Sequence, residues 1–200
     1  MIWEVLGITM SRKRESTRNA IINAFIILLY EKGEVRSISV KDVIERSHIS
    51  RSTFYAYFDN IDEVTAAMAK HYGDDLGQIL VDPTPVREGI TGYRALYYRL
   101  LNFVKNHQTI SSAILLNYSN AGVTKAIQGP MCEAFLELYR PAHHTASETL
   151  LKYVAQYWTY GIYGFIKEWL RNDCSPGVDE MYLVLDKAVS TSTDFMLSAG

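Results

Sequence analysis

Apolar residues recur every three or four positions along most of this chain, and no segment alternates strictly between apolar and polar residues as a strand would. Ile21, Phe25 and Leu28 illustrate the spacing, because positions i, i+4 and i+7 share one face of a helix. The pattern predicts an all-α protein. We expect about nine helices: a first one that ends before Gly33, and others near 39–47, 51–57, 60–80, 91–107, 109–118, 122–139, 144–171 and 178–197. The Gly-Pro pair at 129–130 should kink or split the helix that contains it.

Charge is distributed unevenly along the chain. From Arg12 to Phe58 there are nine Lys or Arg and five Asp or Glu, whereas residues 59–200 contain eleven Lys or Arg and sixteen Asp or Glu. A small basic head therefore precedes a larger acidic body, although the formal net charge is only −2. This asymmetry indicates a polyanionic partner for the head alone.

Residues 50–58, SRSTFYAYF, combine an arginine and hydroxyls with four aromatic side chains. On a helix, Phe54 and Phe58 share one face, and Ser52, Thr53 and Ala56 point roughly the opposite way. If the phenylalanines pack inward, they leave a small, polar surface that can enter the major groove of B-DNA. A short aromatic-rich helix can equally be an ordinary packing element of a core.

Three neighbouring features favour a DNA-binding role for this segment. The preceding residues 39–47 predict a short helix that begins with a capping-box-like pair, Ser39 and Asp42. The local charge is positive, and residues 11–18 place four basic side chains where an arm could reach a phosphate backbone. Together they predict a helix-turn-helix whose recognition helix is 51–57.

The whole segment SVKDVIERSHISRSTFYAYFDNIDEV, residues 39–64, resembles the DNA-binding head of the tetracycline-repressor (TetR) family of transcriptional regulators. The family pattern has a hydroxyl residue before V-x-D-I-A, then a turn, then S-x-G-T-L-Y-x-H-F. The resemblance is strong over about residues 17–70. It implies a flexible basic arm at 1–15, a three-helix helix-turn-helix DNA-binding domain at 16–60, and a helical ligand-binding and dimerisation domain at 61–200.

The same resemblance implies which residues face DNA: Ser39, Arg51, Ser52, Thr53, Tyr55 and Tyr57. The chain departs from the family pattern at three positions. His48 replaces the turn glycine, so the turn must tolerate a Cβ atom. Tyr57 stands where histidine is usual, and Ile61 stands where relatives often carry a lysine that contacts phosphate.

Residues 150–170, LLKYVAQYWTYGIYGFIKEWL, are apolar on nearly every side. A helix without a polar face must be covered all round, either by its own core or by a second copy. We expect a homodimer in which helices 144–171 and 178–197 of two copies form a four-helix arrangement. Gly161 and Gly164 would let the two backbones approach closely.

Aromatic residues are abundant in the body, and a cavity lined by their rings would suit a flat or apolar effector molecule. Aromatic residues at helical spacing can equally form the core. The candidate lining residues are Phe103, Tyr118, Phe135, Tyr139, Tyr157 and Trp158. We expect no cofactor and no metal site, and the two cysteines show no spacing of a zinc site or disulfide framework.

These features predict a sequence-specific transcriptional regulator that binds a palindromic double-stranded DNA operator as a dimer and is released by an unidentified small molecule. A helical module that binds protein rather than DNA is the alternative. An enzyme is not expected, because no nucleophile elbow, metal motif or phosphate-binding loop is present. The longest apolar region, 153–166, is shorter than the roughly 20 residues that span a bilayer, so we expect a cytoplasmic protein without a membrane segment.

Overall fold

The computed structural model describes residues 14–84, 86, 90–117, 121–141 and 146–198, and within these ranges the chain forms nine α-helices. The all-α prediction is therefore confirmed. We name the N-terminal helices the head. They are α2 (Arg14–Lys32), the short 3-10 helix η1 (Val35–Ser37), α3 (Val40–Ser47) and α4 (Arg51–Tyr55).

The remaining helices form the body. They are α5 (Ile61–Leu80), α6 (Tyr93–Asn106), α7 (Gln108–Ser112) with its π-helical continuation η2 (Ala113–Asn117), α8 (Ala121–Tyr139), α9 (Glu148–Arg171) and α10 (Val178–Ser198). Within the described residues, no helix is long and apolar enough to cross a membrane.

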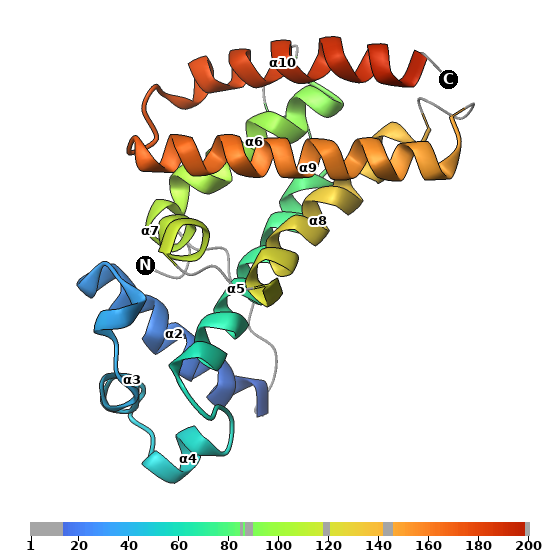
Figure 1. Cartoon of the computed structure of the whole chain (residues 1–200). Helices are drawn as coiled ribbons and strands as arrows, with labels where there is room; N and C mark the ends of the chain where they lie inside the picture. The colour runs from blue at the N-terminus through green and yellow to red at the C-terminus, as the bar shows by residue number, and fades with distance from the viewer. Residues whose placement is uncertain (1–13, 85, 87–89, 118–120, 142–145, 199–200) are drawn as a thin grey trace.

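The head and the two last helices lie at opposite ends of the molecule. Helices α9 and α10 run antiparallel beside each other, and α4 lies at the far end (Figure 1). Helix α5 joins the two ends, because it packs on α2 in the head and on α6 and α8 in the body. Since α2 also contacts α7, the predicted division at residue 60 is bridged by packing, and the domain boundaries stay a prediction.

Local signals explain where several helices begin and end. Gly33 follows α2 with φ of 80°, a left-handed conformation that costs glycine little, and its N–H donates to the Leu29 carbonyl at 2.9 Å. Asn60 caps α5 by accepting a hydrogen bond from the Glu63 N–H at 3.0 Å.

Helix α8 is continuous from Ala121 to Tyr139, with Pro130 inside it, so the pair at 129–130 does not split it. Proline has no N–H to donate to the carbonyl four residues earlier, which here is Ala126. That carbonyl lies against α5 at Gly73, where a Cβ atom would come within 2.0 Å of the Ala126 oxygen. The carbonyl that lacks a helical donor thus lies where a glycine of α5 allows the two backbones to approach closely.

Candidate nucleic-acid interface

The N-terminus of α3 is held by a complete capping box. The Asp42 N–H donates to the Ser39 hydroxyl at 3.2 Å, and the Ser39 N–H and hydroxyl both donate to the Asp42 carboxylate at 2.7 Å. Lys32 of α2 also pairs with that carboxylate at 2.8 Å. The ammonium of Lys32, followed by the Ser39 hydroxyl and N–H, holds the pKa of Asp42 well below its usual range. Helix α3 is therefore fixed both locally and to α2.

The turn after α3 takes a left-handed conformation at His48, with φ of 55° and ψ of 38°. A side chain with a Cβ atom pays about 1 kcal/mol or more in this region, whereas glycine does not. His48 therefore adopts the left-handed turn conformation that the family glycine would adopt, at a cost in local backbone free energy. The Ile49 N–H then donates to the Ile44 carbonyl at 3.4 Å.

Hydroxyl groups cluster at the start of α4. The Ser50 hydroxyl accepts from the Thr53 N–H at 3.0 Å and lies 2.7 Å from the Thr53 hydroxyl and 2.8 Å from that of Ser52. This N-cap satisfies one of the free N–H groups of the first turn. It also fixes the side-chain rotamers of a short helix that could not be stable by itself.

The two faces of α4 differ as the aromatic spacing predicts. Phe54 is completely buried and Phe58 is 3% exposed, and their ring centroids lie 6.2 Å apart. On the opposite side Ser52 and Ala56 are exposed and Thr53 is half-buried. The small polar face is thus not covered by the described part of its own subunit.

Arg51 and Tyr55 form the edge of this face. The Arg51 guanidinium lies 5.6 Å from the centroid of the Tyr55 ring, and Tyr55 is 43% exposed while its ring stands edge-on to Phe54. Among the described residues no carboxylate pairs with Arg51. A cation and a phenolic hydroxyl are therefore available to a polyanion at this edge.

The other candidate residues of the head lie in more restricted environments. Ser39 is exposed, but its hydroxyl is engaged in the capping box. Tyr57 is half-buried and packs against the core. Most of the predicted basic arm lies outside the described residues; Arg18 is described, and its guanidinium lies 5.1 Å from the centroid of the Phe58 ring. The sequence did not reveal this contact, which places a cation beside the Phe58 ring that follows the recognition helix.

The aromatic candidates of the body are spread over several surroundings. Phe135 and Trp158 line the same narrow cavity, and Tyr139 stacks on Phe135 at a centroid distance of 4.1 Å. Phe103 packs elsewhere, on Tyr72 and His107, whereas Tyr157 is 57% exposed on α9. Tyr118 lies outside the described residues.

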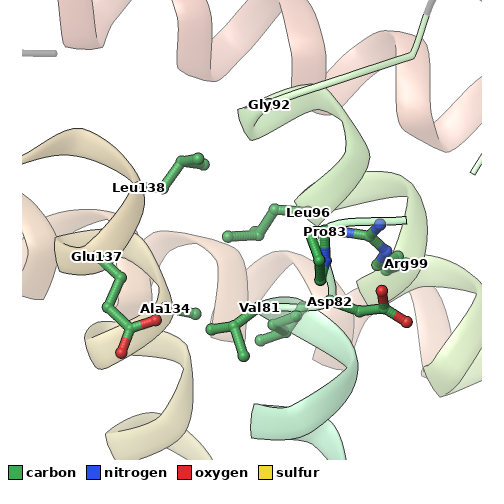
Figure 2. Close-up of a pocket in the computed structure, with 10 residues that line it drawn as sticks. Val81, Asp82, Pro83, Gly92, Leu96, Arg99, Ala134, Glu137 and Leu138 are labelled. Atoms are coloured by element: carbon green, nitrogen blue, oxygen red, sulfur yellow. The ribbon is translucent and has the colours of Figure 1, made fainter. Parts of the chain in front are cut away.

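An open cleft of about 280 Å³ lies between the ends of α5 and α8 and the start of α6, and none of the candidate aromatics that the structure describes lines it. Figure 2 shows Arg99 and Asp82 near one another and Glu137 across the cleft from them, while Leu96 and Leu138 supply apolar surface. These residues could not be found from the sequence, because charged side chains near a linker carry no signal of a cleft.

Comparison with known protein families connects this geometry to a group of proteins. A TetR-type family model described as "Transcriptional regulator C-terminal region" matches residues 94–191. A stretch of 59 residues, 30% of the chain, is 34% identical to the "Uncharacterized HTH-type transcriptional regulator YxbF" of Bacillus subtilis (strain 168). The chain matches only 16% of the length of that relative.

Solved structures share the fold along nearly the whole chain. A TetR-family transcriptional regulator from Streptomyces coelicolor superposes with a TM-score of 0.68 at 20% identity, over 95% of this chain and 87% of that one. The dihydroxyacetone kinase operon activator DhaS superposes with a TM-score of 0.60 at 18% identity, over 92% of this chain and 95% of that one. At such identities the likeness shows the fold.

Proposed function

Because the chain belongs to the tetracycline-repressor family of transcriptional regulators, we propose that it binds a palindromic operator as a homodimer and that a small-molecule ligand releases it. In this account the protein is a repressor and α4 is its recognition helix. The observation that carries the proposal is the uncovered polar face of α4 opposite the fully buried Phe54.

The side chains of this face suit contact with DNA. Small residues at Ser52 and Ala56 let the helix axis come close to the floor of the major groove. Arg51 can donate two hydrogen bonds to a guanine edge or to a phosphate, and the Tyr55 hydroxyl can donate to a phosphate oxygen. Thr53 is assigned to the groove as well. Tyr57 is assigned to a phosphate contact through its hydroxyl group, and Ser39 is assigned to the DNA side through its place at the start of α3, because its hydroxyl already donates to Asp42.

An exposed aromatic face of α9 supports the homodimer. Tyr153, Tyr157 and Tyr160 are 73%, 57% and 60% exposed, and they lie on one side of the helix together with Gly161 and Gly164. Space around both glycines is open, since a Cβ atom at either position would meet no atom within 4 Å. On α10, Leu183 and Val184 are 55% and 49% exposed. A second copy would bury this apolar surface and place two copies of α4 on successive major grooves, about 34 Å apart.

Helix α5 is the element through which a ligand in the body would act on the head. Its first residue, Ile61, follows the head directly, and its last residues line the open cleft. Between these ends it is closest to α8, where Gly73 meets the Ala126 carbonyl and a Cβ atom at Gly77 would lie 3.1 Å from Pro130. A ligand that favours a different angle between α5 and α8 would change the separation of the two heads, in proportion to its differential affinity for the two arrangements.

The proposal is tested by titrating a fluorescent duplex from the region upstream of the protein's own gene with the full chain. We expect the affinity to exceed that for a random duplex of equal length by about a thousand-fold or more, with two chains bound per duplex. The logarithm of the affinity should fall linearly with the logarithm of salt concentration. Equal affinity for the two duplexes would contradict the proposal, and no binding even at low salt would favour a protein-binding module.

A further inference from the structure

The two buried tryptophans of α9 differ in one respect. Trp169 donates its indole N–H to the Pro176 carbonyl at 2.7 Å. Trp158, three helical turns earlier and 7% exposed, has no hydrogen-bond acceptor for its indole N–H among the described residues. A buried donor without an acceptor costs about 1–3 kcal/mol, so such a group indicates an absent partner.

Trp158 lines a narrow cavity of about 10 Å³ where α5, α6, α8 and α9 meet. Apart from Thr159, the other lining residues are apolar: Leu80, Leu96, Leu100, Met131, Phe135 and Ile162. Burial raises the pKa of the Cys132 thiol, and a hydrogen bond with the Thr159 hydroxyl acts in the opposite direction. A single water would fit, but it would find few of the two to four polar partners that a stable buried water needs. The N–H is therefore better matched to one acceptor on an otherwise apolar molecule.

Two leucines connect this cavity to the open cleft. Leu80 and Leu96 line both spaces, so rotation of these side chains would join the cleft of about 280 Å³ to the inner cavity. Met131 on the far wall is unbranched and can adapt to the shape of an occupant. Such a rotation would open a path from the cleft, which Arg99 and Glu137 line, to the indole N–H.

We propose that the cleft and the cavity together bind a mostly apolar molecule whose buried end carries an uncharged acceptor oxygen, such as a ketone, ester or lactone carbonyl. The carbonyl accepts a hydrogen bond from Trp158 Nε1 while its hydrocarbon chain lies along the leucines. A carboxylate is excluded from the inner end, because no cation lines the cavity among the described residues and burying an unpaired charge is costly. That this molecule is the releasing ligand rests on the proposed function.

The test compares three probes of similar length: 2-nonanone, its hydrocarbon analogue 2-methylnon-1-ene, and nonanoate. Binding is followed through the indole N–H resonances of the full chain labelled with 15N-tryptophan. We expect the ketone to bind about tenfold more tightly than either of the others and to shift the Trp158 resonance, which is assigned with the Trp158→Phe variant. The Trp169 resonance should stay in place.

Matched variants separate hydrogen bonding from packing. Trp158→Phe removes the donor and should reduce the preference for ketone over alkene to less than about twofold, whereas Trp169→Phe should keep it near tenfold. Equal affinity for ketone and alkene in the wild-type protein, or no binding of any probe, would overturn the inference. A DNA titration of the same preparation separates the two proposals: operator binding without probe binding refutes only the inference, and ketone preference without operator binding refutes only the proposed function.

Discussion

The head and the body satisfy their polar groups over very different distances along the chain. In the head, Ser39 bonds with Asp42 and Ser50 bonds with Thr53, partners only three residues apart. In the body, the Tyr72 hydroxyl reaches Ser111 at 2.7 Å, 39 residues away, and the indole N–H of Trp158 finds no partner among the described residues. The starts of the two short head helices are thus set by local contacts, whereas these buried polar groups of the body depend on packing between distant helices.

This difference suits the two tasks that we propose. A surface that reads DNA gains from being fixed before binding, because fewer side chains then lose freedom on contact. A body that responds to a ligand must instead have more than one way to pack, and a narrow cavity beside an open cleft provides for that. Helix α5 of the body also packs on α2 of the head, and its glycine contact with α8 tests how tightly the distant helices of the body pack.

The largest effect is expected for Gly73→Ala. The new Cβ atom would lie 2.0 Å from the Ala126 carbonyl oxygen, and a backbone atom in the middle of α8 cannot move away as a flexible side chain can. We expect the free energy of unfolding to fall by about 3 kcal/mol, measured by urea denaturation.

Gly77→Ala is the matched control, because this glycine lies one turn further along α5 and its Cβ atom would lie 3.1 Å from the Pro130 side chain instead of 2.0 Å from a backbone carbonyl oxygen. There the substitution should change the free energy of unfolding by less than about 1 kcal/mol, since the higher helix propensity of alanine offsets the tighter contact. If both variants lost stability to the same extent, the close contact between α5 and α8 would be disproved.

A smaller effect is expected for Ser39→Ala in the head. Loss of the N-cap should lower the free energy of unfolding by about 1 kcal/mol at pH 7. Asp42→Asn should also destabilise the protein at pH 7, because the folded state lowers the pKa of Asp42 and so gains stability above the ordinary carboxyl pKa of about 4.

That contribution is lost as the pH falls from about 4 toward the lowered pKa of the folded state. Denaturation curves of wild type and Asp42→Asn should therefore converge as the pH is lowered from 5 to about 2. A difference that stays constant over this range would mean that the carboxylate does not stabilise α3 through its charge.

Much of the head could be predicted from the sequence because its signals are local. Ser39 with Asp42 and Asn60 with Glu63 mark helix starts in the printed sequence, and the structure confirms both caps. The recognition helix ends at Tyr55 rather than at residue 57, because the Ala56 N–H is shared between the carbonyls of Ser52 and Thr53 as the helix tightens.

The body could be predicted as helices but not as a set of contacts. Whether Tyr157 faces solvent and Trp158 faces a cavity depends on where α5, α6 and α8 lie around α9. Likewise, Pro130 looks like a helix break in the sequence, yet α8 continues through it, and the Ala126 carbonyl, which lacks its helical donor, lies against Gly73 of α5. Partners so distant in sequence leave no local signal.

The central claim is that the uncovered face of α4 contacts DNA, and Tyr55→Ala tests it most directly. Tyr30 on α2 is the matched control, because it belongs to the same head and is exposed to the same 43% as Tyr55. In titrations of the upstream duplex we expect Tyr55→Ala to weaken binding about tenfold and Tyr30→Ala to change it by less than about twofold, with both variants folded by circular dichroism. Wild-type affinity and an unchanged salt dependence in Tyr55→Ala would contradict the account.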